Sequence, residues 1–478
     1  MNDSLICRQC LLHKICIYIF AAWCAVLAAL NLFELISGGT KSIVIIAAVF
    51  AAAFIILVSW LLAEPLSRLR GWKLALLLYA ISLALKLLIV FTIAPEDYSD
   101  FWTFRMGAAS IARGDVSFVT RLPYYSIWAY QFGFEWLTAP FFKLFGQSSS
   151  QFGIILNAFF AAGCTPLIYG IGKSFLSRRN AAAGAMMFTL LPITIDLSAV
   201  FTNQQISLLF ILLACYAAMK KPDPLGGAIA GLCLCIAKIA RPDEIVYIAA
   251  VIVAVLLLKR SRRSFLTLIC MLAVYFACFK LAEYLVSPLQ PFGLGNNYPL
   301  YKFAVGLNEA SFGAFSKEVS LKTFENEAFI LDHELRDAET MKMIQEDLSI
   351  GPARLLRLFT YKTRIQWTGL WHQFEMLHDI AEAKEFVVLG RSFSSDLLQN
   401  CCSKWDNAVR VLFFAGAAVG GFITARRRTV HLTLSVFMLA FMAFSAVMML
   451  IEVQYRYSYF VFPAIVFAAL VPFDGKKE

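Results

Sequence analysis

A short acidic stretch, residues 95–101, contains the side chains of this chain that are best suited to catalysis. Its sequence is Pro-Glu-Asp-Tyr-Ser-Asp-Phe, which places Glu96, Asp97 and Asp100 within five residues. It follows an apolar run, 74–91, that is long enough to cross most of a bilayer. Carboxylates at the mouth of a membrane span are costly unless they are solvated, paired or used. A carboxylate there can take a proton from a hydroxyl group, so Asp97 and Asp100 are the candidate catalytic residues.

Basic residues that can complement these acids lie far along the chain. Arg456 stands in the sequence Glu-Val-Gln-Tyr-Arg-Tyr at 452–457, and an arginine flanked by tyrosines suits charge-assisted bonds to a phosphate. Arg241 lies in a polar break between two apolar runs, and Lys86 lies inside an apolar run. An ionisable residue at that depth is functional by default. We therefore predict that Arg456, Arg241, Tyr455 and Lys86 contribute to substrate binding.

Each of these residues also has a structural interpretation. The acids at 96–100 can cap the helix predicted at 106–112 or simply be solvated. Arg456 can anchor the chain at the membrane interface, and Arg241 can belong to a plain turn. Lys86 can snorkel or pair with a carboxylate. The functional interpretation gains weight because the acids and the arginines fall on one side of the predicted membrane.

The composition is that of an integral membrane protein. Of the 478 residues, 60% are hydrophobic and 15% are charged, which is less charge than a soluble chain carries. Runs of about 20 apolar residues cross a bilayer core about 30 Å thick. About twelve such spans are predicted, at 15–36, 42–63, 74–93, 151–173, 181–200, 204–219, 225–241, 243–259, 264–286, 407–424, 431–451 and 455–471. The predicted fold class is an all-α polytopic membrane protein.

The basic residues of the short connections set the predicted orientation. They follow every second span, so they fall on one side if the spans alternate, and the positive-inside rule makes that side cytoplasmic. Both termini are then cytoplasmic and the acidic stretch is outside. The residues are Arg68, Arg70, Lys73, Arg178, Arg179, Lys220, Lys221, Lys259, Arg260, Arg262, Arg263, Arg426, Arg427 and Arg428, with Lys476 and Lys477 at the C-terminus. The net charge of +10 reflects this topology, so we predict a multi-pass plasma-membrane protein without a nucleic-acid partner.

Four parts of the chain are predicted from the spacing of the spans. The first outer loop, 94–150, mixes aromatic residues with few charges, which favours helices that lie in the membrane interface. The second outer loop contains a basic amphipathic stretch, 353–362, and is large enough for a small cap. The parts are an N-terminal transmembrane hairpin (1–73), a transmembrane core (74–286), an extracytoplasmic loop (287–406) and C-terminal transmembrane helices (407–478).

The N-terminal cysteines have the spacing of half a metal site. Cys7, Cys10, His13 and Cys16 repeat every three residues, but no matching second half follows. We therefore predict no metal at this cluster.

Four stretches of the chain resemble polytopic glycosyltransferases of the GT-C fold, which include protein mannosyltransferases, aminoarabinose transferases that modify lipid A and other family 39-like proteins. Residues 98–115 are similar to the first-loop motif that supplies the catalytic aspartate, and 124–146 to the aromatic segment that ends in Leu-Phe-Gly. Residues 157–192 resemble the next two spans, and 455–463 resemble the late Arg-Tyr and Pro pattern. The resemblance implies a GT-C-like bundle of about 12 transmembrane helices, with interfacial helices and a small extracytoplasmic cap.

The resemblance also implies an activity. The donor would be a sugar linked to a polyprenyl phosphate, with its lipid in a membrane groove and its sugar at the outer surface. Asp100 is implied as the general base. Asp97 stays open as an alternative base or as a ligand of a divalent cation, the one cofactor that the resemblance leaves open. The sugar and the acceptor also stay open.

These inferences combine into one mechanistic hypothesis. Asp100 deprotonates an acceptor hydroxyl, which attacks the anomeric carbon with inversion as the polyprenyl phosphate leaves. Arg456 and Arg241 stabilise the charge that gathers on that phosphate. Tyr124 and Tyr125 shape the groove.

Two other functions are compatible with the same residues. A flippase or transporter of a lipid-linked saccharide would also need many spans and a site for an anionic lipid, although long asymmetric outer loops without inverted repeats disfavour it. An O-antigen-type polymerase or ligase would depend on outer-loop arginines such as Arg241 and Arg456. The early acidic stretch favours the transferase.

Overall fold

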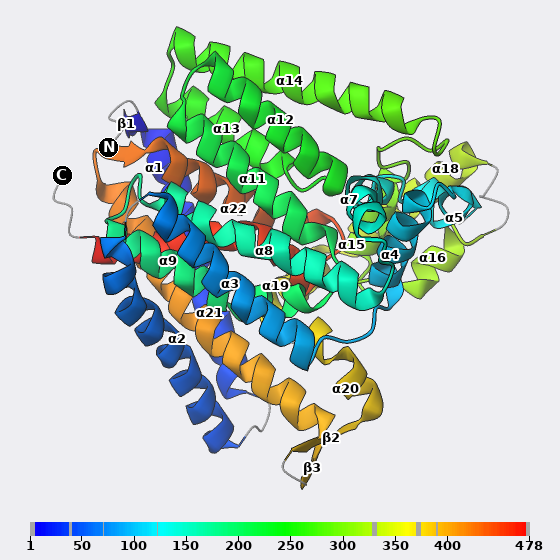
Figure 1. The fold of residues 1–478 in the computed structure, drawn as a ribbon, viewed down its shortest axis with the longest axis horizontal. Helices are drawn as coiled ribbons and strands as arrows, with labels where there is room; N and C mark the ends of the chain where they lie inside the picture. Colours follow the sequence, from blue (N-terminus) through cyan, green and yellow to red (C-terminus); the bar gives the residue numbers. More distant parts are fainter. Residues whose placement is uncertain are drawn as a thin grey trace.

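The computed structural model describes residues 5–37, 41–69, 71–121, 123–326, 332–369, 374–388 and 391–474. These residues are mostly helical (Figure 1). The strands described among them form two antiparallel ribbons: β1 (Ile6–Arg8) pairs with β4 (Thr429–His431), and β2 (Glu385–Val388) pairs with β3 (Arg391–Ser394). The predicted all-α class is confirmed.

Eight helical segments in the described part of the chain are long and apolar enough to cross a membrane. A ninth is formed if two helices that meet at a bend of 58° count as one span. The bend falls at Leu191-Pro192, where proline keeps the preceding residue extended. The eight segments are α1 (Leu11–Ile36), α2 (Ser42–Arg68), α3 (Trp72–Thr92), α8 (Ser150–Gly172), α14 (Arg262–Val286), α21 (Ser395–Arg426), α22 (Leu432–Leu450) and the series η4 (Tyr455–Val461), α23 (Phe462–Leu470) and η5 (Val471–Phe473). The bent pair is α9 (Arg178–Leu190) with α10 (Pro192–Asp196) and η2 (Leu197–Ala199).

The other three predicted spans are also helices, but they are shorter or more polar. They are α11 (Asn203–Lys220), α12 (Pro224–Ala240) and α13 (Ile245–Leu258). The last two have 17 and 14 residues, fewer than the roughly 20 that cross a bilayer core, and α11 opens with three polar residues. Each predicted span therefore coincides with helix, whereas the count of about twelve is not confirmed.

The two predicted outer loops meet at one end of the long helices (Figure 1). Figure 1 places α4, α5, α7, α15, α16 and α18 together there. The first loop forms α4 (Ser99–Ala112), α5 (Ser117–Arg121), α6 (Pro123–Ile127) and α7 (Gln131–Phe145). The second forms α15 (Pro299–Leu307), α16 (Lys317–Lys322), α18 (His333–Leu348), α19 (Pro352–Trp367), η3 (Glu375–Leu377) and α20 (His378–Ala383).

The basic connections lie together at the other end. Arg179 Nε is 3.5 Å from a carboxylate oxygen of Glu64, next to the end of α2. The backbone N–H of Ser177 donates to Asp474 Oδ1 over 2.8 Å, close to the end of the described chain. Strand β4 follows Arg426, Arg427 and Arg428 directly and pairs with β1 near the N-terminus. This grouping is the one that alternating spans require. The cytoplasmic placement of the termini stays a prediction, and residues 1–4 and 475–478 lie outside the described residues.

The N-terminal helices pack onto the C-terminal part of the bundle. Phe20 of α1 meets Phe441 of α22 edge to face, with ring centroids 5.4 Å apart. Glu34 at the end of α1 accepts from Arg364 Nε of α19 over 2.6 Å. Trp60 of α2 contacts Phe473, with ring centroids 5.8 Å apart. The hairpin predicted for residues 1–73 is thus joined to the remainder of the fold through its side chains.

Candidate active site

A cavity of about 410 Å³ lies where the two outer loops cover the helix ends. Its walls come from the start of α4, from α6 and the start of α7, from the turn between α12 and α13, from α15 and from the segment between α22 and η4. Three cations and three carboxylates are among the lining residues: Arg241, Lys302, Arg456, Asp100, Asp243 and Glu452. The positive and negative groups balance, so a charged ligand has to exchange with an existing partner.

Asp100 lies in the first turn of α4 and faces this cavity. The helix dipole favours a carboxylate at that position. Tyr124 Oη donates to Asp100 Oδ1 over 3.2 Å, and Arg456 Nη2 lies 3.4 Å from Asp100 Oδ2. The preceding Ser99 has φ +48°, an uncommon angle for a residue other than glycine, and such strain clusters at functional sites. Asp100 keeps 35% of its side chain exposed, enough to meet a ligand.

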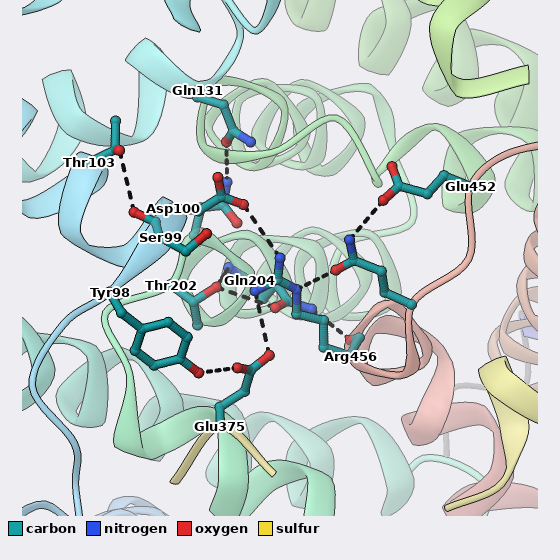
Figure 2. A network of polar contacts seen from close by, with 12 residues as sticks. Tyr98, Ser99, Asp100, Thr103, Gln131, Thr202, Gln204, Glu375, Glu452 and Arg456 are labelled. Carbon is teal, nitrogen blue, oxygen red and sulfur yellow. Dashed lines mark hydrogen bonds and ion pairs between the residues drawn. The ribbon is translucent and has the colours of Figure 1, made fainter. Parts of the chain in front are cut away.

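The Arg456 guanidinium has three polar side-chain partners, two of which, Asp100 and Glu375, are labelled in Figure 2. Its Nη2 faces Asp100, its Nη1 lies 3.5 Å from Glu375 Oε1, and its Nε donates to Gln454 Oε1 over 2.8 Å. Its backbone oxygen accepts from Gln204 Nε2 of α11 over 2.6 Å. The guanidinium carbon also lies 5.2 Å from the centre of the Phe101 ring. These contacts fix the arginine at the cavity wall.

The residues that precede Arg456 alternate between the cavity and the core. Gln454 is extended, with φ −141° and ψ 143°, and successive side chains of extended backbone point to opposite sides. Glu452, Gln454 and Arg456 accordingly line the cavity, whereas Val453 and Tyr455 are buried. Tyr455 contacts Arg410, whose guanidinium lies 4.3 Å from the ring centre.

Arg241 lies on the wall between α12 and α13. Its guanidinium forms an ion pair with Asp243, donates to Asn203 Oδ1 over 3.3 Å and lies 4.8 Å from the centre of the Tyr457 ring. Burial disfavours the charge of Arg241, but Asp243, Tyr457 and Tyr130 together outweigh burial and raise the pKa of the guanidinium. Arg241 is thus a fixed cation in the same cavity as Arg456.

A second buried ion pair, between Lys302 of α15 and Glu452, joins the second outer loop to the cavity. The Lys302 ammonium also lies 4.9 Å from the centre of the Trp128 ring. Burial would lower the pKa of Lys302, but Glu452, Tyr457 and Tyr130 together outweigh burial and raise it. The backbone N–H of Glu452 donates to the Lys302 oxygen over 2.9 Å, so the pair also fixes the main chain.

Of the predicted site residues, the structure brings together Asp100, Tyr124, Arg241 and Arg456 at the cavity. The other four lie elsewhere. Asp97 Oδ2 accepts from Arg105 Nε over 2.7 Å, and the same arginine donates to the Ser148 oxygen over 2.7 Å. The Tyr125 hydroxyl donates to Glu135 Oε1 over 2.6 Å. Lys86 is buried within α3, and Tyr455 is buried beside Arg410.

The divalent cation that the resemblance left open would need a set of ligands. No group of three or more His, Cys, Asp or Glu side chains that could hold a metal ion occurs among the described residues. Asp97 is engaged with an arginine, whose positive charge opposes a cation beside it. The residues present therefore do not fit a protein-bound metal at Asp97.

One comparison with known proteins gives a match. Residues 132–285 match the family of dolichyl-phosphate-mannose-protein mannosyltransferases. The match supports a membrane glycosyltransferase of the GT-C type. No curated protein and no solved structure matches the chain. The matched region runs from α7 to α14 and contains Arg241, while Asp100 and Arg456 lie on either side of it.

Several residues in or beside the cavity were not predicted from the sequence. Glu375 and Lys302 come from the second outer loop, where isolated charges in a polar segment give no signal. Gln454 and Glu452 did carry one, because they stand two and four residues before Arg456, and extended backbone places such residues on one side. The same alternation would have placed Tyr455 on the opposite side.

Proposed function

We propose that this chain transfers a sugar from a polyprenyl-phosphate-linked donor to an acceptor hydroxyl at the extracytoplasmic surface, with inversion at the anomeric carbon. The observation that carries the proposal is the pairing of Asp100 with Arg456 in one cavity, with an Oδ2 to Nη2 distance of 3.4 Å. A carboxylate can accept the proton of the hydroxyl, and a guanidinium can bind the phosphate. The name of the matched family includes a dolichyl-phosphate-linked sugar, a donor of this class.

In this mechanism the acceptor oxygen forms a bond to the anomeric carbon while the bond from that carbon to the phosphate oxygen breaks. The hydroxyl proton goes to Asp100, and the electron pair leaves with the polyprenyl phosphate. The leaving group gains negative charge as the bond breaks, so a cation beside it is worth most in the transition state. Arg456 and Arg241 line the same cavity and are suited to this role.

Asp100 is favoured over Asp97 as the base because of what each carboxylate faces. Asp100 lines the cavity and is partly exposed. Asp97 faces Arg105, which also holds the Ser148 oxygen, so its contacts connect the two ends of the first outer loop. We assign Asp97 a structural role in that loop.

The proposal is tested with the purified full-length chain in lipid nanodiscs and a radiolabelled polyprenyl-phosphate-hexose. We expect loss of sugar from the lipid with the wild type and at least about a hundredfold slower loss with Asp100→Asn, since general-base catalysis contributes about that much. Glu96→Gln is the matched control, because Glu96 belongs to the same acidic stretch, is exposed and does not line the cavity. Equal rates for the wild type and Asp100→Asn would refute the assignment, and movement of intact donor between leaflets without cleavage would favour a flippase.

A further inference from the structure

Arg456 is shared between two carboxylates that differ in how firmly they are held. Figure 2 shows the guanidinium between Asp100 on one side and Glu375 on the other. The two distances are nearly equal, 3.4 Å from Nη2 to Asp100 Oδ2 and 3.5 Å from Nη1 to Glu375 Oε1. A phosphate that binds Arg456 must therefore compete with one of the two acids. The role of Arg456 therefore depends on which of the two carboxylates the phosphate displaces.

Glu375 is fixed by its surroundings. The Tyr98 hydroxyl donates to Glu375 Oε2, and the Tyr98 ring stacks on the His378 ring with centroids 3.4 Å apart and an angle of 12° between the planes. The next residue, Met376, donates its backbone N–H to Asp196 Oδ1 over 3.0 Å. Only 17% of the Glu375 side chain is exposed, and it is not one of the residues that line the cavity. The contact between Glu375 and Arg456 is thus made behind the cavity wall.

Asp100 is held more loosely and on the other side of the guanidinium. Its second partner is the Tyr124 hydroxyl at 3.2 Å, and its side chain is about twice as exposed as that of Glu375, 35% against 17%. It lines the cavity into which a ligand would enter. An anion arriving from the cavity therefore meets the bond from Arg456 to Asp100 first.

We propose that Glu375 is a positioning residue that holds Arg456 at the cavity wall, and that the donor phosphate displaces Asp100 from Arg456 and so releases it as the base. The inference rests on the proposed function and adds an order to it: donor binding frees the carboxylate that then accepts the proton of the acceptor hydroxyl. Before donor binds, the two carboxylate oxygens of Asp100 are engaged with Arg456 and with the Tyr124 hydroxyl. Activation of the acceptor is thereby tied to the presence of a donor.

The proposal makes opposite predictions for two substitutions that each remove one negative charge beside Arg456. Asp100→Asn removes the competitor, so binding of polyprenyl phosphate should become tighter by several-fold while turnover is lost. Glu375→Gln weakens the bond that holds the arginine, so binding should weaken by about tenfold, which corresponds to part of one charge-assisted hydrogen bond. If Glu375 were only a second competing anion, its removal would tighten binding as well.

Binding is measured with the full-length chain in nanodiscs and with polyprenyl phosphate itself as the probe, so the readout does not depend on turnover. Glu382→Gln is the matched control. This glutamate lies in α20, the short helix that follows η3, is 73% exposed and contacts His378. Tyr98→Phe removes the hydroxyl that holds Glu375 without changing any charge, and we expect it to weaken binding in the same direction as Glu375→Gln. Glu375→Asp keeps the charge and should restore part of the affinity.

Five outcomes decide the proposal. Tighter binding by Asp100→Asn together with weaker binding by Glu375→Gln and Tyr98→Phe, at unchanged thermal stability, supports it. Tighter binding by Glu375→Gln overturns the positioning role, and unchanged or weaker binding by Asp100→Asn overturns the displacement of Asp100. If the wild type cleaves labelled donor yet the variants bind equally, the inference fails and the proposed function stands. If the wild type neither cleaves donor nor binds polyprenyl phosphate, both fail.

Discussion

Arg456 lies 3.4 Å from the carboxylate of Asp100 although 356 residues separate them in the chain. Asp100 belongs to the first helix after α3, and Arg456 is the second residue of η4, which opens the series η4, α23 and η5. Segments from early and late in the sequence, α4 and η4, therefore meet in one ion pair at the cavity. We expect substitutions at this pair to change chemistry, and substitutions at the surrounding ion pairs to change stability.

Replacing Arg456 by lysine should lower turnover by about a hundredfold with a smaller effect on folding, because removal of one group that stabilises developing negative charge typically costs that much. Lysine keeps the charge but cannot hold Asp100, Glu375 and Gln454 at once. Steady-state cleavage of labelled donor measures the effect. Arg113→Lys is the control, since Arg113 is exposed at the end of α4. Turnover within twofold of the wild type would exclude a role for the guanidinium geometry.

Asp97→Asn should leave the rate of sugar loss within a few-fold of the wild type but lower the stability of the fold. The substitution leaves Arg105 without its carboxylate in a largely buried position, for which we expect a cost of about 2 kcal/mol. Thermal unfolding in detergent gives the stability, and Glu283→Gln in the exposed pair with Lys280 provides the comparison. A variant that folds like the wild type yet has lost its activity would make Asp97 the base.

Gly107→Ala should destabilise the helix that carries Asp100. A Cβ at this position would lie 2.0 Å from Glu135 Oε2, which is fully buried in α7. Such an overlap typically costs about 1–3 kcal/mol and would shift α4 relative to α7. Gly295→Ala serves as the control, because nothing lies within 4 Å of a Cβ placed there. Equal melting temperatures for the two variants would show that α4 and α7 do not pack as closely as described.

Lys302→Met should destabilise the second outer loop far more than the same change at Lys317. Lys302 pairs with Glu452, whose side chain is only 3% exposed, and loss of one partner of a buried pair costs about 3–5 kcal/mol. Lys317 pairs with Glu325 at the surface, where an ion pair is worth at most about 1 kcal/mol. Limited proteolysis of the loop combined with thermal unfolding measures both. Similar losses for the two variants would contradict the burial of the first pair.

The helices were predictable because their signals are local. A run of apolar residues must be helical in a bilayer, since backbone groups there have no other partners, so each predicted span coincides with helix. The length of each helix was less predictable. Leu191-Pro192 breaks one span, and Asn203, Gln204 and Gln205 make another more polar. Neither effect follows from the number of apolar residues in the run.

The partners of the site residues were the part that the sequence left undetermined. Asp97 and Asp100 are only three residues apart in the sequence, yet Asp97 faces Arg105 and Asp100 faces Arg456. Glu375 carried no signal because its role depends on Tyr98 and Arg456, from distant parts of the chain.

The sequence by itself determined a helical membrane protein whose acids and arginines gather on one side, because burial of apolar helices and the bias of basic loops act on local stretches of chain. Only the tertiary structure decided which carboxylate meets which cation, because an ion pair forms over a few ångströms and depends on how α4, η3 and η4 pack against one another. Asp100, Glu375 and Arg456 became one site through that packing.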